Sequence, residues 1–352
     1  MPKLQDYINS KNIALYIKEL PVEDTIDQTL FPNKKVLGTK LEHAKGAKKK
    51  AVALRQSTFD VAAKMRSLNA KVEVSTTEIP FFKEAVGIDE TTRREVINAM
   101  NCNNENIVNA VLDQVFDGQA NLIKGAGIIA KKMRAQVIQT GKIIYSSDPK
   151  DGNVAVEYGV PENHRTILTA DDKWTNPAAD IVGDVKNFQK IITDDNCPKP
   201  NIMLMTEKTF DETFLINTAI TNDIRNSNLN TLRILSQSDY LQYAKERMNL
   251  IIVFLEDTTY YPYEGADPVP YYENYKITLM SGATLGDTVY GTTPEEFDLT
   301  HGSGKLDTTI IEPGIAVTTN TKWDPVTVDT KVSVMPIVSF DRADEVFFGT
   351  VA

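Results

Sequence analysis

The side chains best suited to metal binding or covalent catalysis are few and far apart in this chain. Its three histidines, His43, His164 and His301, share no HExxH or similar spacing, and the two cysteines, Cys102 and Cys197, are isolated. A zinc site needs several such ligands at short, regular spacings, so the sequence predicts no metal site. Cys102 falls in a predicted helix and is more typical of a packed thiol than of a nucleophile.

Two further patterns resemble catalytic motifs without meeting their requirements. The run HGSGK at 301–305 resembles a phosphate-binding loop, but Leu306 stands where that motif has serine or threonine, and no buried strand precedes it. Acidic pairs at 171–172 and 194–195 are typical of turns and helix starts, and neither has an evident burial that would raise a carboxyl pKa. We therefore expect no enzymatic activity, no catalytic residue and no cofactor.

Charge is distributed very unevenly along the chain. Between Lys34 and Lys71 there are eleven lysine or arginine residues and only two acids, whereas the whole chain has a net charge of −10. From Glu256 to the end, sixteen aspartate or glutamate residues face five basic ones. A basic segment in an acidic chain makes each molecule electrostatically complementary to its own copies, which favours self-association. The negative total argues against a general nucleic-acid-binding protein.

The basic segment supplies the residues that we expect to contact other subunits. Lysine runs are also common in solvated loops, and that alternative stays open at this point. The predicted intersubunit contact residues are Lys45, Lys48, Lys49, Lys50, Arg55, Lys64 and Arg66.

Length and composition are those of a soluble globular protein with more than one domain. The chain has 352 residues, of which 41% are hydrophobic and 24% charged. No run of eighteen apolar residues predicts a membrane span, and the first twenty residues lack the apolar core of a signal peptide. Two isolated cysteines predict no disulfide framework, which fits a reducing cytoplasm.

The first half of the chain reads as an arm, a loop and a long helix. Residues 1–36 predict an extended arm with little core of its own, and 37–82 predict a long two-stranded loop. Apolar residues spaced by three and four predict a helix from 89 to about 123, interrupted at Gly125 and Gly127. A second helical piece at 128–139 should end at Gly141, followed by strands at 142–146 and 153–158.

The second half predicts a mixed α/β layer domain. The segment 169–177 (TADDKWTNP) predicts a turn with an exposed tryptophan, and 180–193 an amphipathic helix. Strands and helices then alternate, with a helix at 207–219. The run LIIVFL at 250–255 predicts a strand buried on both faces. The alternating segment 326–338 predicts another strand, and the whole chain is of the α+β class.

In this order, the parts resemble the major capsid proteins of tailed bacteriophages. Within them the chain is similar to the lambda-type coat protein family, which shares the fold named for phage HK97. Asp172-Lys173-Trp174 with 176–181 resembles that family's tryptophan turn, and 208–210, 251–254, 320–323 and 339–352 resemble later elements. The insertion at 260–275 does not match. Family-like structural positions are Trp174, Pro177, Asp180, Phe210, Arg225 and Trp323.

The resemblance implies an HK97-like capsid fold with four parts. These are an N-terminal arm (1–36), an extended β-hairpin loop or E-loop (37–82), a peripheral domain with a long spine helix (83–177 and 285–321), and an axial α/β domain (178–284 and 322–352). It also implies that the arm and the basic loop reach onto neighbouring subunits. Ordering such segments costs roughly 1–2 kcal/mol per residue, which contacts between subunits must offset.

The implied function is that of a structural head protein without chemistry of its own. Hexamers and pentamers would form an icosahedral shell around double-stranded DNA, bound without sequence specificity, and the acidic total would keep DNA from being held rigidly. The resemblance further implies a scaffolding protein and a portal as partners and allows a decoration protein, whereas no membrane is involved. It places the protein in the virion, after assembly in the host bacterial cytoplasm. Two alternatives remain, an encapsulin-like nanocompartment shell around protein cargo, and a soluble two-domain α/β ligand-binding protein or enzyme.

Overall fold

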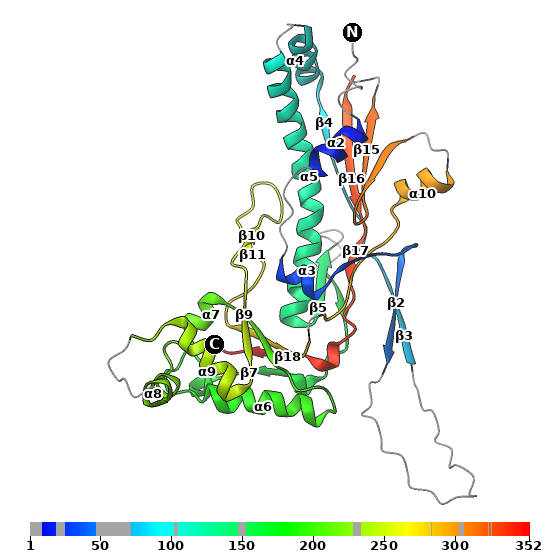
Figure 1. Cartoon of the computed structure of the whole chain (residues 1–352). Coiled ribbons are helices and arrows are strands. Elements are labelled where there is room, and N and C mark those ends of the chain that lie inside the picture. The colour runs from blue at the N-terminus through cyan, green and yellow to red at the C-terminus, as the bar shows by residue number, and fades with distance from the viewer. Residues whose placement is uncertain are drawn as a thin grey trace, which may run out of the picture. The chain divides into compact units, whose positions relative to one another are not determined.

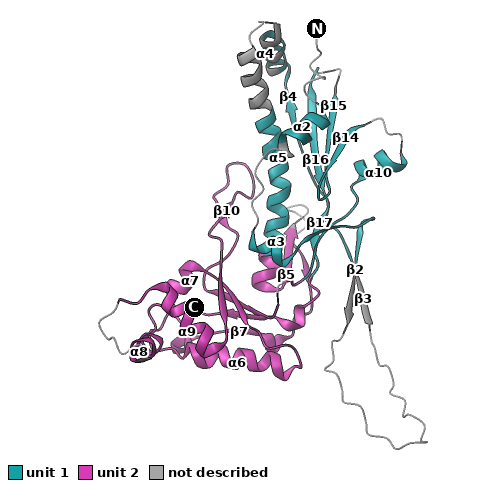
Figure 2. Cartoon of the chain, in the orientation of Figure 1, with its two compact units in different colours: residues 1–41, 77–134, 286–339 teal, residues 42–76, 135–285, 340–352 magenta. Residues whose placement is uncertain are grey.

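The structure, a computed structural model, describes residues 9–18, 25–46, 72–101, 105–146, 153–227, 234–282, 284–302, 306–322, 324 and 326–352. They form two compact units, each built from three separate stretches of the chain (Figure 2). The first unit comprises Met1–Leu41, Thr77–Arg134 and Gly286–Ser339, and the second comprises Glu42–Thr76, Ala135–Leu285 and Phe340–Ala352. The expected arm, loop, peripheral and axial domains stay a prediction, because they are defined by places in an assembled shell rather than by contacts within one chain.

An antiparallel sheet of four strands forms the centre of the first unit, in the order β14-β15-β16-β4. Its strands are β14 (Asp307–Ile311), β15 (Ile315–Thr321), β16 (Val328–Val334) and β4 (Phe82–Ile88). Val328, Val332 and Val334 of β16 are buried, as the alternating pattern predicted. The short strand β17 (Pro336–Val338) follows, so the predicted strand at 326–338 is confirmed as two consecutive strands.

Helices α4 (Glu90–Asn101) and α5 (Glu105–Thr140) form the helical segment predicted from residue 89 (Figure 1). The predicted interruption at Gly125 and Gly127 is wrong, because α5 continues through both. A glycine inside a helix costs only about 1 kcal/mol relative to alanine. That cost is outweighed by packing of the adjacent α5 residues Ile123, Ala126 and Ala130 in the core of the first unit.

The end of α5 follows the sequence prediction. Gly141 has a φ of +65°, in the left-handed region that favours glycine, and its N–H donates to the Val137 carbonyl at 2.9 Å. A Cβ at this position would lie 2.7 Å from Val160 Cγ2. Glycine is therefore required here both by the backbone conformation and by the close packing.

The N-terminal segment has more core than predicted. Helix α2 (Ser10–Lys18) and helix α3 (Ile26–Leu30) lead into strand β1 (Asn33–Lys35). Ile13 and Ala14 of α2 belong to the same hydrophobic cluster as α5 and β14–β16. Ser10 Oγ also donates to Asp307 Oδ1 at 2.8 Å. The expectation of an arm with little core is thus wrong for the described residues, because an amphipathic helix can pack on its own sheet.

The extended loop begins as a two-stranded sheet, as predicted. Strand β2 (Lys40–Gly46) pairs with strand β3 (Val72–Glu78). Residues 47–71 lie outside the described part of the chain, and the division between the two compact units crosses both strands.

The second unit is built on a mixed five-stranded sheet in the order β7-β18-β12-β8-β9 (Figure 1). Its strands are β7 (Arg165–Ile167), β18 (Phe347–Thr350), β12 (Lys276–Met280), β8 (Ile202–Thr206) and β9 (Ile251–Leu255). Its helices are α6 (Ile181–Asp194), α7 (Glu207–Asp211), α8 (Thr218–Ser227) and α9 (Gln237–Met248). The single helix predicted at 207–219 is therefore α7 and the start of α8.

Strand β9 occupies a different place from the one its sequence indicated. Among the described strands it pairs with β8 alone, in parallel, at the edge of the sheet, and Ile251 is 50% exposed. Leu250 and Ile252 are buried on one face of the strand. On the other face Leu255 is buried but Ile251 is half exposed, so that face is only partly covered. The prediction of a strand buried on both faces is wrong.

Smaller elements complete the second unit. The strands β5 (Lys142–Ser146) and β6 (Asn153–Glu157) pair antiparallel, as predicted, and β10 (Thr259–Tyr260) pairs with β11 (Val269–Pro270). Short 3-10 helices are η1 (Glu162–His164), η2 (Ala170–Asp172) and η3 (Ala343–Glu345).

Candidate assembly site at the root of the extended loop

A three-stranded sheet in the first unit carries the chain into the extended loop. It has the order β1-β13-β17, with β13 (Thr288–Tyr290) at its centre, parallel to β1 and antiparallel to β17. Beyond β1, the Val36 N–H donates to the Tyr290 carbonyl at 2.9 Å and so continues the pairing. The direction in which the loop leaves the unit is therefore set by hydrogen bonds to a central strand.

Both legs of the loop are hydrogen-bonded where they leave the unit. Gly38, with a φ of +105°, donates its N–H to Thr292 Oγ1 at 3.1 Å and accepts from the Thr292 N–H at 2.9 Å. On the returning leg, the Ile79 N–H donates to the Thr39 carbonyl at 2.9 Å, and the Ile79 side chain is buried. We call this place, where residues 35–39 leave the unit and Ile79 returns to it, the root of the loop.

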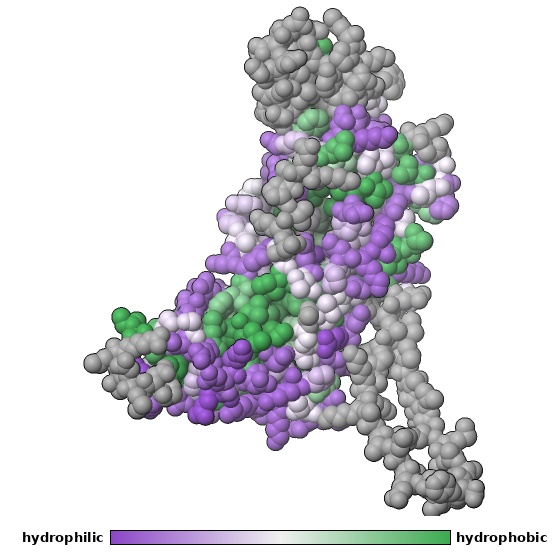
Figure 3. All heavy atoms as spheres, in the orientation of Figure 1, coloured by the Kyte–Doolittle hydropathy of each residue, from purple (hydrophilic) through white to green (hydrophobic). Residues whose placement is uncertain are grey.

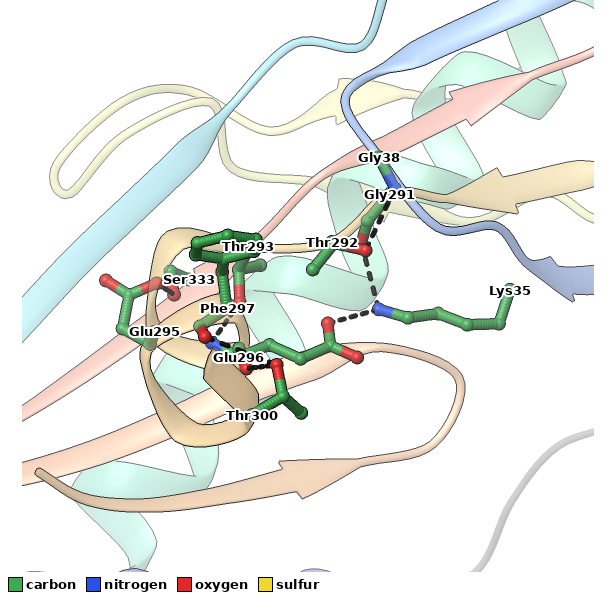
Figure 4. A network of polar contacts seen from close by, with 10 residues as sticks. All are labelled: Lys35, Gly38, Gly291, Thr292, Thr293, Glu295, Glu296, Phe297, Thr300 and Ser333. Atoms are coloured by element: carbon green, nitrogen blue, oxygen red, sulfur yellow. Dashed lines mark hydrogen bonds and ion pairs between the residues drawn. The ribbon is translucent and has the colours of Figure 1, made fainter. Parts of the chain in front are cut away.

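Lys35 joins this root to helix α10 (Pro294–His301). Its Nζ donates to the Gly291 carbonyl at 2.9 Å and to Glu296 Oε2 at 2.6 Å (Figure 4). Helix α10 starts with Thr293, whose Oγ1 accepts from the Glu296 N–H at 3.3 Å, and Pro294 follows at the first helical position. The cap therefore holds the carboxylate of Glu296 in reach of β1.

Glu295 points away from Lys35 and ties α10 to the main sheet (Figure 4). Its side chain is 5% exposed; Oε1 pairs with Lys331 Nζ, and Oε2 accepts from Ser333 Oγ at 2.7 Å. Burial by itself raises the pKa of Glu295. The hydrogen bonds from Lys331 and Ser333, a backbone hydrogen bond and the positive charge of Lys331 together outweigh burial, so the pKa lies below its ordinary value. Neighbouring glutamates on α10 thus bind two different sheets of the first unit.

A buried ion pair contacts the same three-stranded sheet through Thr288 of β13. Arg134 Nε of α5 donates to Asp27 Oδ2 of α3 at 2.5 Å, and both side chains are at most 5% exposed. Arg134 Nη1 also lies 3.4 Å from Thr288 Oγ1, which in turn donates to the Phe31 carbonyl at 2.8 Å. The pair connects the N-terminal segment, the long helix and β13 in one network.

These contacts are those of a mechanical anchor. The carboxylates at the root are held in ion pairs, and among the described residues no group of three or more histidine, cysteine or acidic side chains could hold a metal ion. Within that part of the chain, no helix combines the length and the apolar character needed to cross a bilayer.

Hydrophobic side chains also reach the surface among hydrophilic ones (Figure 3). In the first unit, Leu37 beside the root is 86% exposed and Phe297 of α10 is 59% exposed. The Phe297 ring stacks on the His301 ring with centroids 5.0 Å apart, so its exposed face is held in one position. Singly exposed apolar side chains are normal on protein surfaces, so these two residues do not by themselves mark a binding surface.

The predicted contact residues of the loop are not placed by the structure. Only the backbone of Lys45 is described, at the end of β2, and the other six residues lie outside the described part, as does Trp323. Their role between subunits stays a prediction. The six are Lys48, Lys49, Lys50, Arg55, Lys64 and Arg66.

Trp174, predicted to be exposed, is completely buried in the second unit. Its Nε1 donates to Asp184 Oδ2 at 2.9 Å, and its ring packs against Phe188 and Phe214. Burial, and then the nearby carboxylates Asp180 and Asp172, raise the pKa of Asp184 against the effect of this hydrogen bond. The exposed-tryptophan prediction is wrong because α6 supplies a partner for the indole N–H, which allows the whole ring to be buried.

The other family-like positions have structural places in the second unit. Asp180 caps α6 by accepting from the Gly183 N–H at 2.9 Å, and the Pro177 carbonyl accepts from the Thr218 N–H at 2.9 Å. Phe210 is fully buried, whereas Arg225 is exposed on α8.

The contacts of Lys35 and Glu296 at the root of the loop were not predicted from the sequence. The capping pattern Thr-Pro-Glu-Glu at 293–296 was visible, but its partners lie far away in sequence.

Comparisons with known proteins agree with this architecture. A family model described as phage major capsid protein E matches residues 9–351. A putative capsid protein of a prophage from Escherichia coli CFT073 superposes with a TM-score of 0.59 at 12% identity, covering 98% of this chain and 99% of that one. A phage-related protein from Bordetella bronchiseptica RB50 gives 0.52 at 11% identity, covering 98% of each chain. No curated protein matches the sequence.

Proposed function

Because this chain belongs to the phage major capsid protein E family, it is a structural capsid protein with the HK97-like α+β fold, and we propose how it builds a shell. Copies associate with one another into hexamers and pentamers that close into an icosahedral shell around double-stranded DNA. The subunit performs no chemistry of its own in this role. Self-association and a place in the virion follow from the family; the scaffolding protein, portal, optional decoration protein and assembly in the bacterial cytoplasm are parts of the proposal.

The anchored root of the extended loop is the observation that carries the proposal. A loop that contacts a neighbour transmits force to its own subunit only if both legs are fixed. Here β1 pairs with β13, and Lys35 binds Glu296. The returning leg is bonded to the first leg through Ile79 and Thr39, and it continues into β4, which pairs with β16 of the main sheet. Such an anchor supports the proposed contact between the basic loop and a neighbouring subunit.

The electrostatic part of the contact is spread over many weak pairs. An isolated exposed ion pair contributes at most about 1 kcal/mol, so no single lysine should decide assembly. Residues 47–71 contain seven lysine or arginine residues and one aspartate. They can therefore form several ion pairs at once with an acidic surface of a neighbouring subunit. Contacts of this kind break and re-form separately, which suits stepwise closure of a shell.

The test is neutralisation of the lysine run. We expect K48Q/K49Q/K50Q to give a folded subunit that forms particles poorly, measured by negative-stain electron microscopy and by sedimentation. The matched control is K186Q/K190Q/K199Q, which removes three exposed lysines from the second unit and should assemble normally. Normal particles from the first variant would refute the role of the loop, and a wild-type chain that forms no assemblies would refute the shell itself.

A further inference from the structure

The insertion at 260–275, together with the residues from Glu256 that lead into it, forms a hairpin that stands out from the second unit (Figures 1 and 2). Strands β10 and β11 pair over only two residues each, and between 261 and 270 every residue except Ala266 is exposed. The turn contains Gly265 with a φ of +81°, and a Cβ there would meet nothing within 4 Å. The end of the hairpin therefore has no packing partner in the described part of its own unit.

The hairpin is stabilised at its base and exposes aromatic rings beyond it. Tyr260 and Tyr271 pack with ring centroids 4.8 Å apart, and Tyr272 is buried. Further out, Tyr261 is 64% exposed and Tyr263 is 73% exposed. Three prolines at 262, 268 and 270 restrict the backbone. Rigid, exposed tyrosines are typical of binding surfaces, because little conformational entropy is lost when they are covered.

The charge of the hairpin has one sign. Five carboxylates and no lysine or arginine occur from Glu256 to Tyr275. Among the residues that the structure describes, no ion pair involves Asp257, Glu264 or Asp267, whereas carboxylates such as Glu295 are already paired within the first unit. The exposed surface of the hairpin is thus acidic and aromatic, and it is available to a basic partner.

We infer that this hairpin binds residues 47–71 of a second copy of the chain, an inference that rests on the proposed function. That segment has seven lysine or arginine residues and one aspartate, together with apolar residues such as Leu54 and Phe59. Lysine and arginine interact favourably both with carboxylates and with the faces of tyrosine rings. Tyr261 and Tyr263 meet the cations and apolar side chains, and Glu264 and Asp267 neutralise the charge.

The test maps contacts inside assembled particles. A photo-crosslinking amino acid in place of Tyr263 is introduced into the full chain, and unlabelled and isotope-labelled subunits are mixed before assembly. Mass spectrometry should find crosslinks from position 263 to residues 47–71 of the other isotopic form. The same amino acid at Ile167, 73% exposed in the same unit but outside the hairpin, should give at least about tenfold fewer such crosslinks.

A charge exchange tests the same contact by function. E264K/D267K should lower the yield of the inter-copy crosslink by about tenfold, and K48E/K49E in the same chain should restore it. Particles that form while position 263 crosslinks only to its own chain, to another hairpin or to another segment would overturn this inference and leave the proposed function standing. If the wild-type chain forms no assemblies, the proposed function fails and this inference fails with it.

Discussion

Breaking the buried ion pair between Arg134 and Asp27 should be among the most destabilising single changes in the first unit. The two side chains are 5% and 1% exposed, and the Nε–Oδ2 distance is 2.5 Å. Asp27→Asn leaves a buried guanidinium without a counterion, and Arg134→Met leaves a buried carboxylate. Removing one member of such a pair typically costs about 3–5 kcal/mol, because the remaining charge has lost its water and its partner.

The double variant separates the pair from the packing around it. Asp27→Leu with Arg134→Met removes both charges, and an apolar replacement of a buried pair is often nearly neutral, within about 1 kcal/mol. Lys34→Gln is the matched control in the same unit, since the Lys34–Asp287 pair is exposed, with side chains 60% and 27% accessible. It should cost less than about 1 kcal/mol.

The assay is the free energy of unfolding of the unassembled subunit in urea, followed by fluorescence, with particle yield as a second measurement. We expect both single variants to lose several kcal/mol and most of their particles, and the double variant to recover stability. If the single variants lose no more than Lys34→Gln, the pair does not anchor the N-terminal segment and the reasoning is refuted. Because the network also includes Thr288 in β13, a loss of particles without a loss of stability would indicate a role confined to assembly.

Two further changes test the local arguments. The pKa of Glu295 is lowered in the fold from its ordinary value of 4.5, so its carboxylate stabilises the subunit above that pH and the contribution is lost as pH falls. Glu295→Gln removes the ion pair with Lys331 and should lower the free energy of unfolding by about 1–3 kcal/mol at pH 7. The variant should also lose less stability than wild type as the pH falls, measured by urea unfolding between pH 3 and 7, which is roughly the range in which carboxyl groups titrate. Parallel curves of stability against pH for variant and wild type would contradict this. Gly141→Ala should destabilise by more than roughly 1–2 kcal/mol, since it combines a positive φ with a clash against Val160. The matched Gly118→Ala, in an open position on α5, should instead raise the melting temperature, and equal effects of the two changes would show that packing at Gly141 is unimportant.

Local patterns in the sequence were sufficient for many of the elements. The capping glycine Gly141, the amphipathic helix behind Asp180 and the alternating strand β16 depend on neighbours within one turn or one strand, and each is found where it was predicted. The same holds for the two-stranded start of the loop and for the α+β class. Charge distribution indicated self-association, and the order of the parts indicated the family.

The errors concern features that depend on distant residues. Gly125 was read as a break because propensity counts one residue, whereas packing of the whole helix against the sheet decides its continuity. Trp174 was read as exposed because its neighbours are polar, although Asp184 on the next helix provides a partner for its N–H. For β9 the apolar run predicted a buried strand, but the sheet order that puts it at an edge is not encoded locally.

The sequence by itself determined many of the helices and strands, the location of the positive charge, and the electrostatic complementarity between copies of the chain. Only the tertiary structure decided how the loop is anchored, because Lys35 and Glu296 are 261 positions apart and meet only when β1 pairs with β13. Likewise the acidic tyrosine hairpin had no assigned role in the sequence, and its exposure became evident only once the rest of the second unit was packed. Spacing along the chain governs local hydrogen bonds and periodicity, whereas ion pairs and exposure depend on which distant surfaces the fold brings together or leaves open.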